Sequence, residues 1–463
     1  MIPLEVTDVA ALLGAHVTPP DGRRTVEHVM TDSRKRSAGP AIFFALRTER
    51  ADGHDHVVAA EHSGAVAAVV ERMVPGAGLT QLIVSDPWVA LGHLGRHVVD
   101  RVECRVVAIT GSYGKTTVKD LTAAGLAAGR TVTASHASFN NELGVPLTML
   151  SVTAGTDVLV AEAGARNAGD LTAIGELLLP DVSIVTAVGP VHLETFGDED
   201  GVASEKSRLV AALRPTGTAV LNADDDRVAA MAMLAPSVLT VSASGGRADV
   251  RAERVTHDDQ GRARALVHTP WGEVPLALPV PGPHHLVNGL LALAVAAHEG
   301  VELAAAAAGI AAAVTSPSRS TLREVAGVTV LDDAYNASPP TMLGALATLR
   351  ALPCRGRRWA VLGPMAELGP SSLDQHRAIG RACVDGIDRL IVVGEAARGI
   401  VEGVAEVGGS LKVDTVADHA EAADLVLQEV ADGDAVLFKA SRVATLDRAA
   451  ASVLAALDGG GAA

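Results

Sequence analysis

The segment 106–117, which reads VVAITGSYGKTT, limits the fold of this chain more than any other, because an apolar run is followed directly by a glycine-rich turn and Lys-Thr. Glycines let the backbone turn tightly and direct its N–H groups at an anion, and a helix that follows presents its positive end there. The segment therefore predicts a strand, a phosphate-binding turn and a helix, and with them a site for ATP or GTP. Lys115 would reach the β- and γ-phosphates and the Thr116 hydroxyl would bind Mg²⁺, and the rest of the turn would be formed by Gly111, Gly114 and Thr117.

The match to the usual phosphate-loop spacing is incomplete, since Ile109 stands where the first glycine is expected. The pattern is a shorter variant, Thr-Gly-x-x-Gly-Lys-Thr-Thr. An ordinary glycine-rich turn between a strand and a helix is the alternative interpretation. Lys-Thr-Thr directly after an apolar strand favours the nucleotide site.

The composition of the chain bounds its class. A chain of 463 residues is too long for one hydrophobic core and indicates about two to four domains. Its 48% hydrophobic and 20% charged content is typical of a globular protein, and because aromatic residues make up only 2%, the cores must be built from Ala, Val and Leu. The formal net charge of -16 argues against nonspecific binding to nucleic acid or to an anionic membrane.

No targeting or membrane segment is recognisable. The first residues lack the basic segment and apolar core of a signal peptide, and no uninterrupted apolar run approaches the roughly 20 residues that span a bilayer. We therefore expect a cytoplasmic enzyme without membrane insertion. The three cysteines, Cys104, Cys354 and Cys383, are widely spaced, which indicates small buried side chains rather than a disulfide framework or a metal cluster.

Strand and helix patterns divide the chain into three α/β blocks. The segment up to about residue 100 mixes short apolar strands with helices. From residue 106 to about residue 313 apolar strands alternate with helical patterns, which predicts a largely parallel sheet covered by helices. The third block, after residues 315–318, is typical of a Rossmann-type domain, but it has no GxGxxG fingerprint and so no sign of a dinucleotide.

Two polar residues follow predicted strands of the middle block. Glu162 ends the strand 157–161, and His192 follows the strand 182–188 through Gly-Pro. In open parallel sheets the loops at the carboxyl ends of the strands converge with helix N-termini, and ligands bind there. Thr116, Glu162 and His192 are therefore expected to meet despite their distance in sequence.

Eleven short strings are spread in one order over nearly the whole chain: 31–34, 52–54, 110–117, 139–148, 162–166, 189–194, 221–225, 284–288, 332–339, 365–369 and 439–442. Taken together they resemble the Mur ligase family, and their collinearity is more specific than any one motif. The resemblance implies a three-domain α/β architecture. It would consist of an N-terminal UDP-sugar-binding domain at 1–101, a central ATP-binding domain at 102–314 with its phosphate loop on a mostly parallel sheet, and a Rossmann-like, acceptor-binding C-terminal domain at 315–463.

The resemblance also implies an ATP-dependent ligase that forms an amide bond. In this family a carboxylate attacks the γ-phosphate of ATP to give an acyl phosphate and ADP, and an amine then displaces phosphate. The strings are most similar to those of the member that adds D-alanyl-D-alanine to UDP-N-acetylmuramoyl-tripeptide in peptidoglycan precursor synthesis. The expected partners are thus a UDP-linked muramoyl peptide and D-Ala-D-Ala or a similar amine, with no nucleic acid, and we expect a monomer. Ligation should require domain closure, with a hinge near residues 315–320.

Because a carboxylate and a triphosphate repel each other, cations must neutralise them before attack is possible. The resemblance implies that the catalytic residues are Lys115, Lys206, His192 and Asn141, and that Mg²⁺ is held by Thr116, Glu162 and His192. The nucleotide would also contact Asn288, Asp333 and Asn336. The UDP-sugar end would be received by Ser33, Arg34 and His54. From the residues alone, Asp333 could be a turn residue, Asn288 an ordinary helix residue and Arg34 a partner in a surface salt bridge.

Lys206 matches the lysine that Mur ligases carbamylate with CO₂. A bare ammonium would repel Mg²⁺, whereas a carbamate offers two oxygens. The modification needs a neutral amine, and hence a desolvated lysine or one beside another cation. A solvated lysine on a helix is the alternative, since exposed lysine is the norm.

Three departures from the family pattern make a specialised relative the second interpretation. Lys206 is followed by Ser-Arg rather than Gly-Glu, neither Arg319 nor Arg323 falls in register with the family's Gly-Arg-x-Glu, and Pro364 takes a position usually held by a polar residue. One alternative is therefore a similar amide ligase that acts on other peptide or amino-acid substrates in a specialised biosynthetic pathway. The other is a non-catalytic ATP-binding switch, which the presence of the residues assigned to the second metal disfavours.

Overall fold

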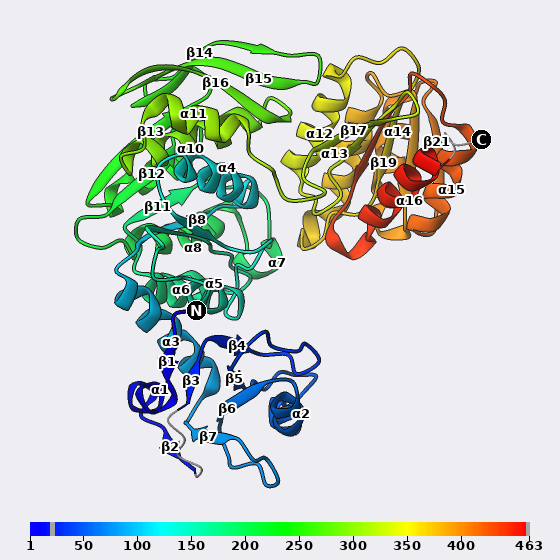
Figure 1. Cartoon of the computed structure of the whole chain (residues 1–463). Coiled ribbons are helices and arrows are strands. Elements are labelled where there is room, and N and C mark those ends of the chain that lie inside the picture. The colour runs from blue at the N-terminus through cyan, green and yellow to red at the C-terminus, as the bar shows by residue number, and fades with distance from the viewer. Residues whose placement is uncertain (19–23, 460–463) are drawn as a thin grey trace.

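The computed structural model describes residues 1–18 and 24–459, which form three α/β units, each built on its own sheet (Figure 1). The N-terminal unit has a five-stranded sheet in the order β2-β7-β6-β5-β4, in which β4 to β7 run parallel and β2 is antiparallel. Its elements are β1 (Leu4–Glu5), α1 (Val6–Leu13), β2 (His16–Val17), β3 (Thr25–Val26), β4 (His28–Met30), β5 (Ala41–Phe44), α2 (Val57–His62), β6 (Ala65–Val70), β7 (Thr80–Ile83) and α3 (Pro87–Val102).

Helix α3 joins the N-terminal unit to the central one. It begins at Pro87, which needs no hydrogen bond at the first helical position, and the Asp86 carboxylate accepts from two backbone N–H groups of the first turn. Its buried face, which includes Leu91, packs in one apolar cluster with Val106 and Met149 of the central unit. The two units therefore share a continuous core.

The central unit has a nine-stranded sheet in the order β16-β15-β14-β13-β12-β11-β8-β10-β9. Its strands are β8 (Arg105–Thr110), β9 (Val132–Ala134), β10 (Val158–Glu162), β11 (Val182–Val185), β12 (Thr218–Asn222), β13 (Ser237–Ser242), β14 (Val250–His257), β15 (Arg262–Thr269) and β16 (Gly272–Pro281). Its helices are α4 (Lys115–Ala127), α5 (Gly144–Leu150), α6 (Asp170–Leu178), α7 (Leu193–Phe196), α8 (Glu199–Ala211), α9 (Asp226–Ala229), α10 (His285–His298) and α11 (Leu303–Ala311).

The largely parallel sheet predicted for the central unit is confirmed for β8 to β14, but the predicted alternation with helices is wrong from β13 to β16, where strand follows strand with no helix between them. Of these, β14, β15 and β16 are antiparallel neighbours joined by short turns. In β15 every second residue is buried, namely Ala263, Ala265 and Val267, which is typical of a strand with one solvent-exposed face. β8 lies between β10 and β11, so the turn that follows it opens where the strand order reverses.

The C-terminal unit has a six-stranded sheet in the order β17-β18-β22-β19-β20-β21, parallel except for β17. Its elements are β17 (Thr321–Val325), β18 (Val328–Asp332), α12 (Pro339–Ala351), β19 (Arg358–Leu362), α13 (Ser372–Cys383), β20 (Arg389–Val393), α14 (Arg398–Val407), β21 (Lys412–Val416), α15 (His419–Glu429), β22 (Ala435–Lys439) and α16 (Leu446–Gly459). The sequence did not predict β17 and β21, because both are edge strands without a buried apolar run.

Each of the three large sheets, and the two-stranded sheet of β1 and β3, takes its strands from within one of the predicted ranges, although the boundaries 1–101, 102–314 and 315–463 stay predictions. Figure 1 shows the C-terminal unit beside the central one and the N-terminal unit below it. No helix in the described part of the chain combines the length and apolar character that a membrane crossing requires.

Candidate active site

The predicted phosphate loop is a sharp turn between β8 and α4. Gly111 has a φ of 145°, and a Cβ atom at this position would lie 1.9 Å from Thr186 Oγ1, so only glycine fits. Gly114, with a φ of 82°, immediately precedes α4, whose N-terminal N–H groups face the loop. Lys115 lies over the turn, where its Nζ donates to the Gly111 carbonyl at 2.6 Å, and burial lowers the pKa of this lysine.

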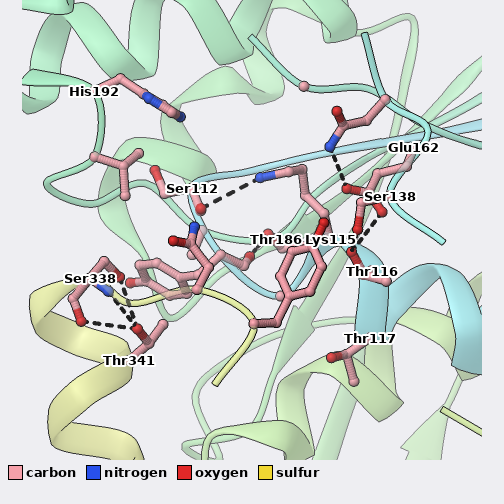
Figure 2. Close-up of a pocket in the computed structure, with 18 of the residues that line it drawn as sticks. Ser112, Lys115, Thr116, Thr117, Ser138, Glu162, Thr186, His192, Ser338 and Thr341 are labelled. Atoms are coloured by element: carbon pink, nitrogen blue, oxygen red, sulfur yellow. Dashed lines mark hydrogen bonds between the residues drawn. The ribbon is translucent and has the colours of Figure 1, made fainter. Parts of the chain in front are cut away.

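Thr116 and Glu162 meet, as the sequence predicted. Thr116 Oγ1 donates to Glu162 Oε2 at 2.7 Å, and the other carboxylate oxygen accepts from Asn140 Nδ2 at 2.8 Å. Glu162 is the last residue of β10, which pairs with β8, so both strands deliver their ends to the same edge of the sheet. Ser138 Oγ lies 3.3 Å from Thr116 Oγ1 on the same side (Figure 2).

A cavity of about 1030 Å³ opens between the central and C-terminal units above this pair. Most of the predicted catalytic and nucleotide-binding residues line it: Gly114, Lys115, Thr116, Thr117, Asn141, Glu162, His192, Asn288, Asp333 and Asn336. Five predicted site residues lie outside the lining, namely Gly111, Lys206, Ser33, Arg34 and His54.

His192 shares the cavity but does not bond to Glu162. Figure 2 shows the two side chains on either side of Lys115. His192 Nδ1 instead pairs with the carboxylate of Glu367 from the C-terminal unit, and the backbone N–H of Leu193 donates to the Glu367 carbonyl at 3.1 Å. The hydrogen bond with His192 lowers the pKa of Glu367. Of the three residues that were expected to meet, Thr116 and Glu162 are in contact, whereas His192 contacts the C-terminal unit instead.

The donor set around Thr116 suits a hard cation. Among the residues that the structure describes, no three His, Cys, Asp or Glu side chains gather closely enough to hold an ion by themselves. Mg²⁺ is usually bound through one or two carboxylates together with phosphate oxygens and water. The Glu162 carboxylate and the Thr116 hydroxyl fit that pattern.

Lys206 lies in α8 and is 1% exposed. Burial, assisted by the positive charge of Lys115, lowers its pKa from 10.5 to about 7. The solvated helix lysine is therefore excluded, and a large share of the amine is neutral near pH 7. This is the condition that carbamylation requires, although the carbamate itself stays a prediction.

The remaining predicted residues of the cavity already have protein partners. Asp333 Oδ2 pairs with Lys439 Nζ at 2.6 Å, and the same ammonium donates to the Asn336 carbonyl at 3.1 Å. Asn288 Nδ2 lies 3.1 Å from a ring nitrogen of a neighbouring histidine, and Asn141 Oδ1 accepts the N–H that begins α5. Their roles toward nucleotide and substrate stay predictions.

Ser33, Arg34 and His54 lie in the N-terminal unit. Arg34 is exposed and forms a salt bridge with the carboxylate two residues before it, as the alternative interpretation had it. His54 is buried, with Nδ1 2.6 Å from Asp52 Oδ1 and Nε2 accepting the Glu71 N–H at 2.9 Å. Because both ring nitrogens are engaged, His54 organises its loop here, and the assignment of these three residues to the UDP-sugar stays a prediction.

Two family models match the chain, the Mur ligase middle domain over residues 109–296 and the glutamate ligase domain of Mur ligases over residues 318–442. The UDP-N-acetylmuramoyl-tripeptide–D-alanyl-D-alanine ligase of Mycobacterium tuberculosis is 37% identical over 502 aligned residues, which cover 98% of each chain. The chain belongs to the Mur ligase family.

Solved structures of Mur ligases share the whole architecture of this one. MurF from Acinetobacter baumannii is 28% identical with a TM-score of 0.88, over 98% of this chain and 99% of that one. MurF from Thermotoga maritima in complex with ADP is 27% identical with a TM-score of 0.82, over 93% and 98% of the two chains. The predicted α/β Mur ligase fold is thereby confirmed.

Further side chains of this Mur ligase line the cavity without having been predicted there, among them Ser138, Asn140, Arg319 and Glu367. Asn140 and Glu367 stood within two of the quoted strings, but nothing in a string distinguishes a residue that contacts a neighbour from one that faces a ligand. Arg319 had only been noted as out of register. Its Nη2 donates to Ser138 Oγ at 3.0 Å, and its guanidinium lies 3.9 Å from the centre of the Tyr335 ring.

Proposed function

We propose that this Mur ligase uses ATP to join D-alanyl-D-alanine to UDP-N-acetylmuramoyl-tripeptide in the synthesis of the peptidoglycan precursor. Relatives named for this reaction match nearly the full length of the chain. The observation that carries the proposal is the arrangement around Lys115, which combines the phosphate turn, the Thr116–Glu162 pair and the buried Lys206. The reaction would take place in the cytoplasm, on a monomer.

In the first step the terminal carboxylate of the muramoyl peptide attacks the γ-phosphorus of ATP. A bond forms between the carboxylate oxygen and phosphorus, the bond to the β–γ bridging oxygen breaks, and ADP leaves. Lys115 and the N–H groups at the start of α4 hold the phosphates and disperse their charge. Lys115 Nζ donates to the carbonyls of Gly111 and Ser112 in the loop, so these hydrogen bonds have to be exchanged for hydrogen bonds to the triphosphate when ATP binds.

Bound through Thr116 and Glu162, Mg²⁺ would neutralise part of the charge that otherwise keeps the attacking carboxylate away from the triphosphate. Glu162 is 1% exposed, and its oxygens are oriented by a hydroxyl and an amide, so the side chain is fixed before any ligand arrives. We further propose that Lys206 is carbamylated. The modification would convert a costly buried ammonium beside Lys115 into an anion that this cation stabilises.

In the second step the amine nitrogen of the acceptor attacks the acyl carbon, the bond from that carbon to the phosphate oxygen breaks, and inorganic phosphate leaves together with the proton that the nitrogen loses. Acyl phosphates hydrolyse readily, so water must be kept out of the site. The cavity lies between two units, and its C-terminal wall carries Asp333, Asn336 and Glu367. We propose that this wall receives the acceptor and closes over the nucleotide, while the N-terminal unit holds the UDP-sugar.

The test is phosphate release by the purified protein with ATP, Mg²⁺ and UDP-N-acetylmuramoyl-tripeptide, with and without D-Ala-D-Ala, followed by mass spectrometry of the product. We expect release that depends on the dipeptide and a product heavier by one dipeptide less water. A panel of other dipeptides and amino acids forms the comparison. Faster turnover with another amine would indicate the specialised ligase, and no stimulation by any amine would indicate the ATP-binding switch.

A further inference from the structure

Helix α4 carries two adjacent charged residues one turn after Lys115, and neither of them lines the cavity. Lys119 is 3% exposed, and its Nζ lies 2.9 Å from Asp120 Oδ1. A buried ion pair gains little net stability, because the attraction has to offset the desolvation of both charges. The further contacts of the two side chains therefore show what the pair does.

Lys119 holds the loop that precedes α5. Its Nζ donates to the carbonyls of Ser135 at 2.9 Å and Ala137 at 3.0 Å. Ala137 has a φ of 47°, a left-handed conformation that costs free energy for a residue with a side chain and persists only where neighbours enforce it. The next residue is Ser138, which reaches Thr116 in the phosphate loop. Lys119 thus fixes the position from which Ser138 enters the site.

Asp120 holds the linker between the central and C-terminal units. Its Oδ2 accepts the backbone N–H of Ser316 at 2.7 Å. On the other side, Ser318 Oγ donates to Asp332 Oδ2 of the C-terminal unit at 2.8 Å. Only Pro317 stands between the two attached residues, so the change from one unit to the other is confined to a very short stretch, within the range predicted for the hinge.

The loop held by Lys119 and the linker held by Asp120 lead to one contact. Arg319 lies three residues after Ser316, and Ser138 lies one residue after Ala137. Arg319 Nη2 donates to Ser138 Oγ at 3.0 Å. We propose that Lys119 and Asp120 are positioning residues that set this contact, and with it the place of the Arg319 guanidinium beside the phosphate loop. This role depends on the proposed ligase function, because a cation at that place assists the reaction only if charge develops there on a transferring phosphoryl group.

The test compares Asp120→Ala, Asp120→Asn and a matched control. The control is Asp157→Ala. The Asp157 carboxylate also accepts a backbone N–H at 2.7 Å, but it lies near the edge strand β9 and away from the linker. We expect kcat for ligation to fall about 10- to 100-fold in Asp120→Ala, since small displacements of a positioned group have effects of that size. Asp120→Asn keeps one oxygen that can accept from Ser316 but turns its amide NH2 group toward Lys119 Nζ, so its kcat should fall less than that of Asp120→Ala without reaching the wild-type value. Asp157→Ala should resemble the wild type.

A double-mutant cycle with Arg319→Ala separates positioning from general destabilisation. If Asp120 acts through Arg319, then Asp120→Ala causes no further loss of kcat in the Arg319→Ala background. An equal loss in both backgrounds would overturn the inference, as would full activity of Arg319→Ala.

Amide hydrogen exchange over residues 312–320 gives a readout that does not depend on activity. We expect Asp120→Ala, but not Asp157→Ala, to lose protection at Ser316, and unchanged protection would overturn the inference. A wild-type protein that ligates nothing while Asp120→Ala loses this protection would count against the proposed function and not against the contact between Asp120 and the linker.

Discussion

Lys206 should lower the stability of the fold, because its ammonium is buried beside another cation. Its pKa falls from 10.5 to about 7, mainly through burial and secondly through Lys115. At about 1.4 kcal/mol per pH unit, the difference amounts to about 5 kcal/mol in the free energy of unfolding. Lys206→Met keeps the length of the side chain and removes the charge, so the variant should be more stable than the wild type although it lacks the amine.

The sign of the pH dependence follows from proton binding. Between pH 7 and pH 10.5 the unfolded chain binds a proton at Lys206 that the folded protein does not, so wild-type stability rises with pH in this window. Below pH 7 both states are protonated and the full penalty is present. The advantage of Lys206→Met should therefore be up to about 5 kcal/mol at pH 6 and should shrink by roughly 3 kcal/mol at pH 9.

The measurement is chemical unfolding of both proteins at pH 6 and pH 9, in buffer freed of CO₂, because carbamylation would also remove the buried ammonium. Unfolding of several units need not be two-state, so hydrogen exchange in α8 should accompany the global probe. The matched control is Lys35→Met, at an exposed lysine of the N-terminal unit. A Lys206→Met variant that is less stable than the wild type at pH 6, or a difference that does not change with pH, would refute the reasoning.

Three further outcomes are expected. Lys206→Ala should nearly abolish turnover in the phosphate-release assay, with partial rescue by an added small carboxylate, and unchanged activity would remove Lys206 from the site. Gly111→Ala should weaken ADP binding at least about tenfold in calorimetry, because its Cβ would lie 1.9 Å from Thr186 Oγ1 and the turn would have to open; wild-type affinity would contradict this account of the loop. Glu367→Ala removes the partner of His192 across two units. It should reduce the compaction that small-angle scattering detects when an ATP analogue and the acceptor are both present, whereas Glu395→Ala on the outer surface should not. Equal compaction in both variants would show that the contact does not contribute to closure.

The features that a sequence predicts well here are those that depend on neighbouring residues. The phosphate loop could be predicted because a strand, two glycines and Lys-Thr lie within 12 residues of one another. The meeting of Thr116 and Glu162 followed from one rule, that parallel strands bring their carboxyl ends to one edge. The burial of Lys206 could not be predicted from α8 itself, because the helix is polar overall and the neighbours that bury it come from elsewhere in the chain.

The errors have equally local causes. The run from β14 to β16 was expected to continue the alternation of strands and helices, but its period of two residues between buried positions marks antiparallel strands. The partner of His192 lies 175 residues away in a different unit, and no spacing rule connects the two. His54 stood in a family string, yet its ring is used inside its own loop.

The nine-stranded sheet ends in two strands that cannot easily recruit another strand. At one end β9 is only 3 residues long, and at the other β16 contains Pro275, Pro279 and Pro281, which have no N–H to offer. Open edges of long sheets are the usual template for aggregation and for exchange of strands between molecules. Growth of this sheet by addition of a second copy is therefore disfavoured at both of its borders, so a large and mostly apolar framework can remain confined to one molecule even when the protein is concentrated.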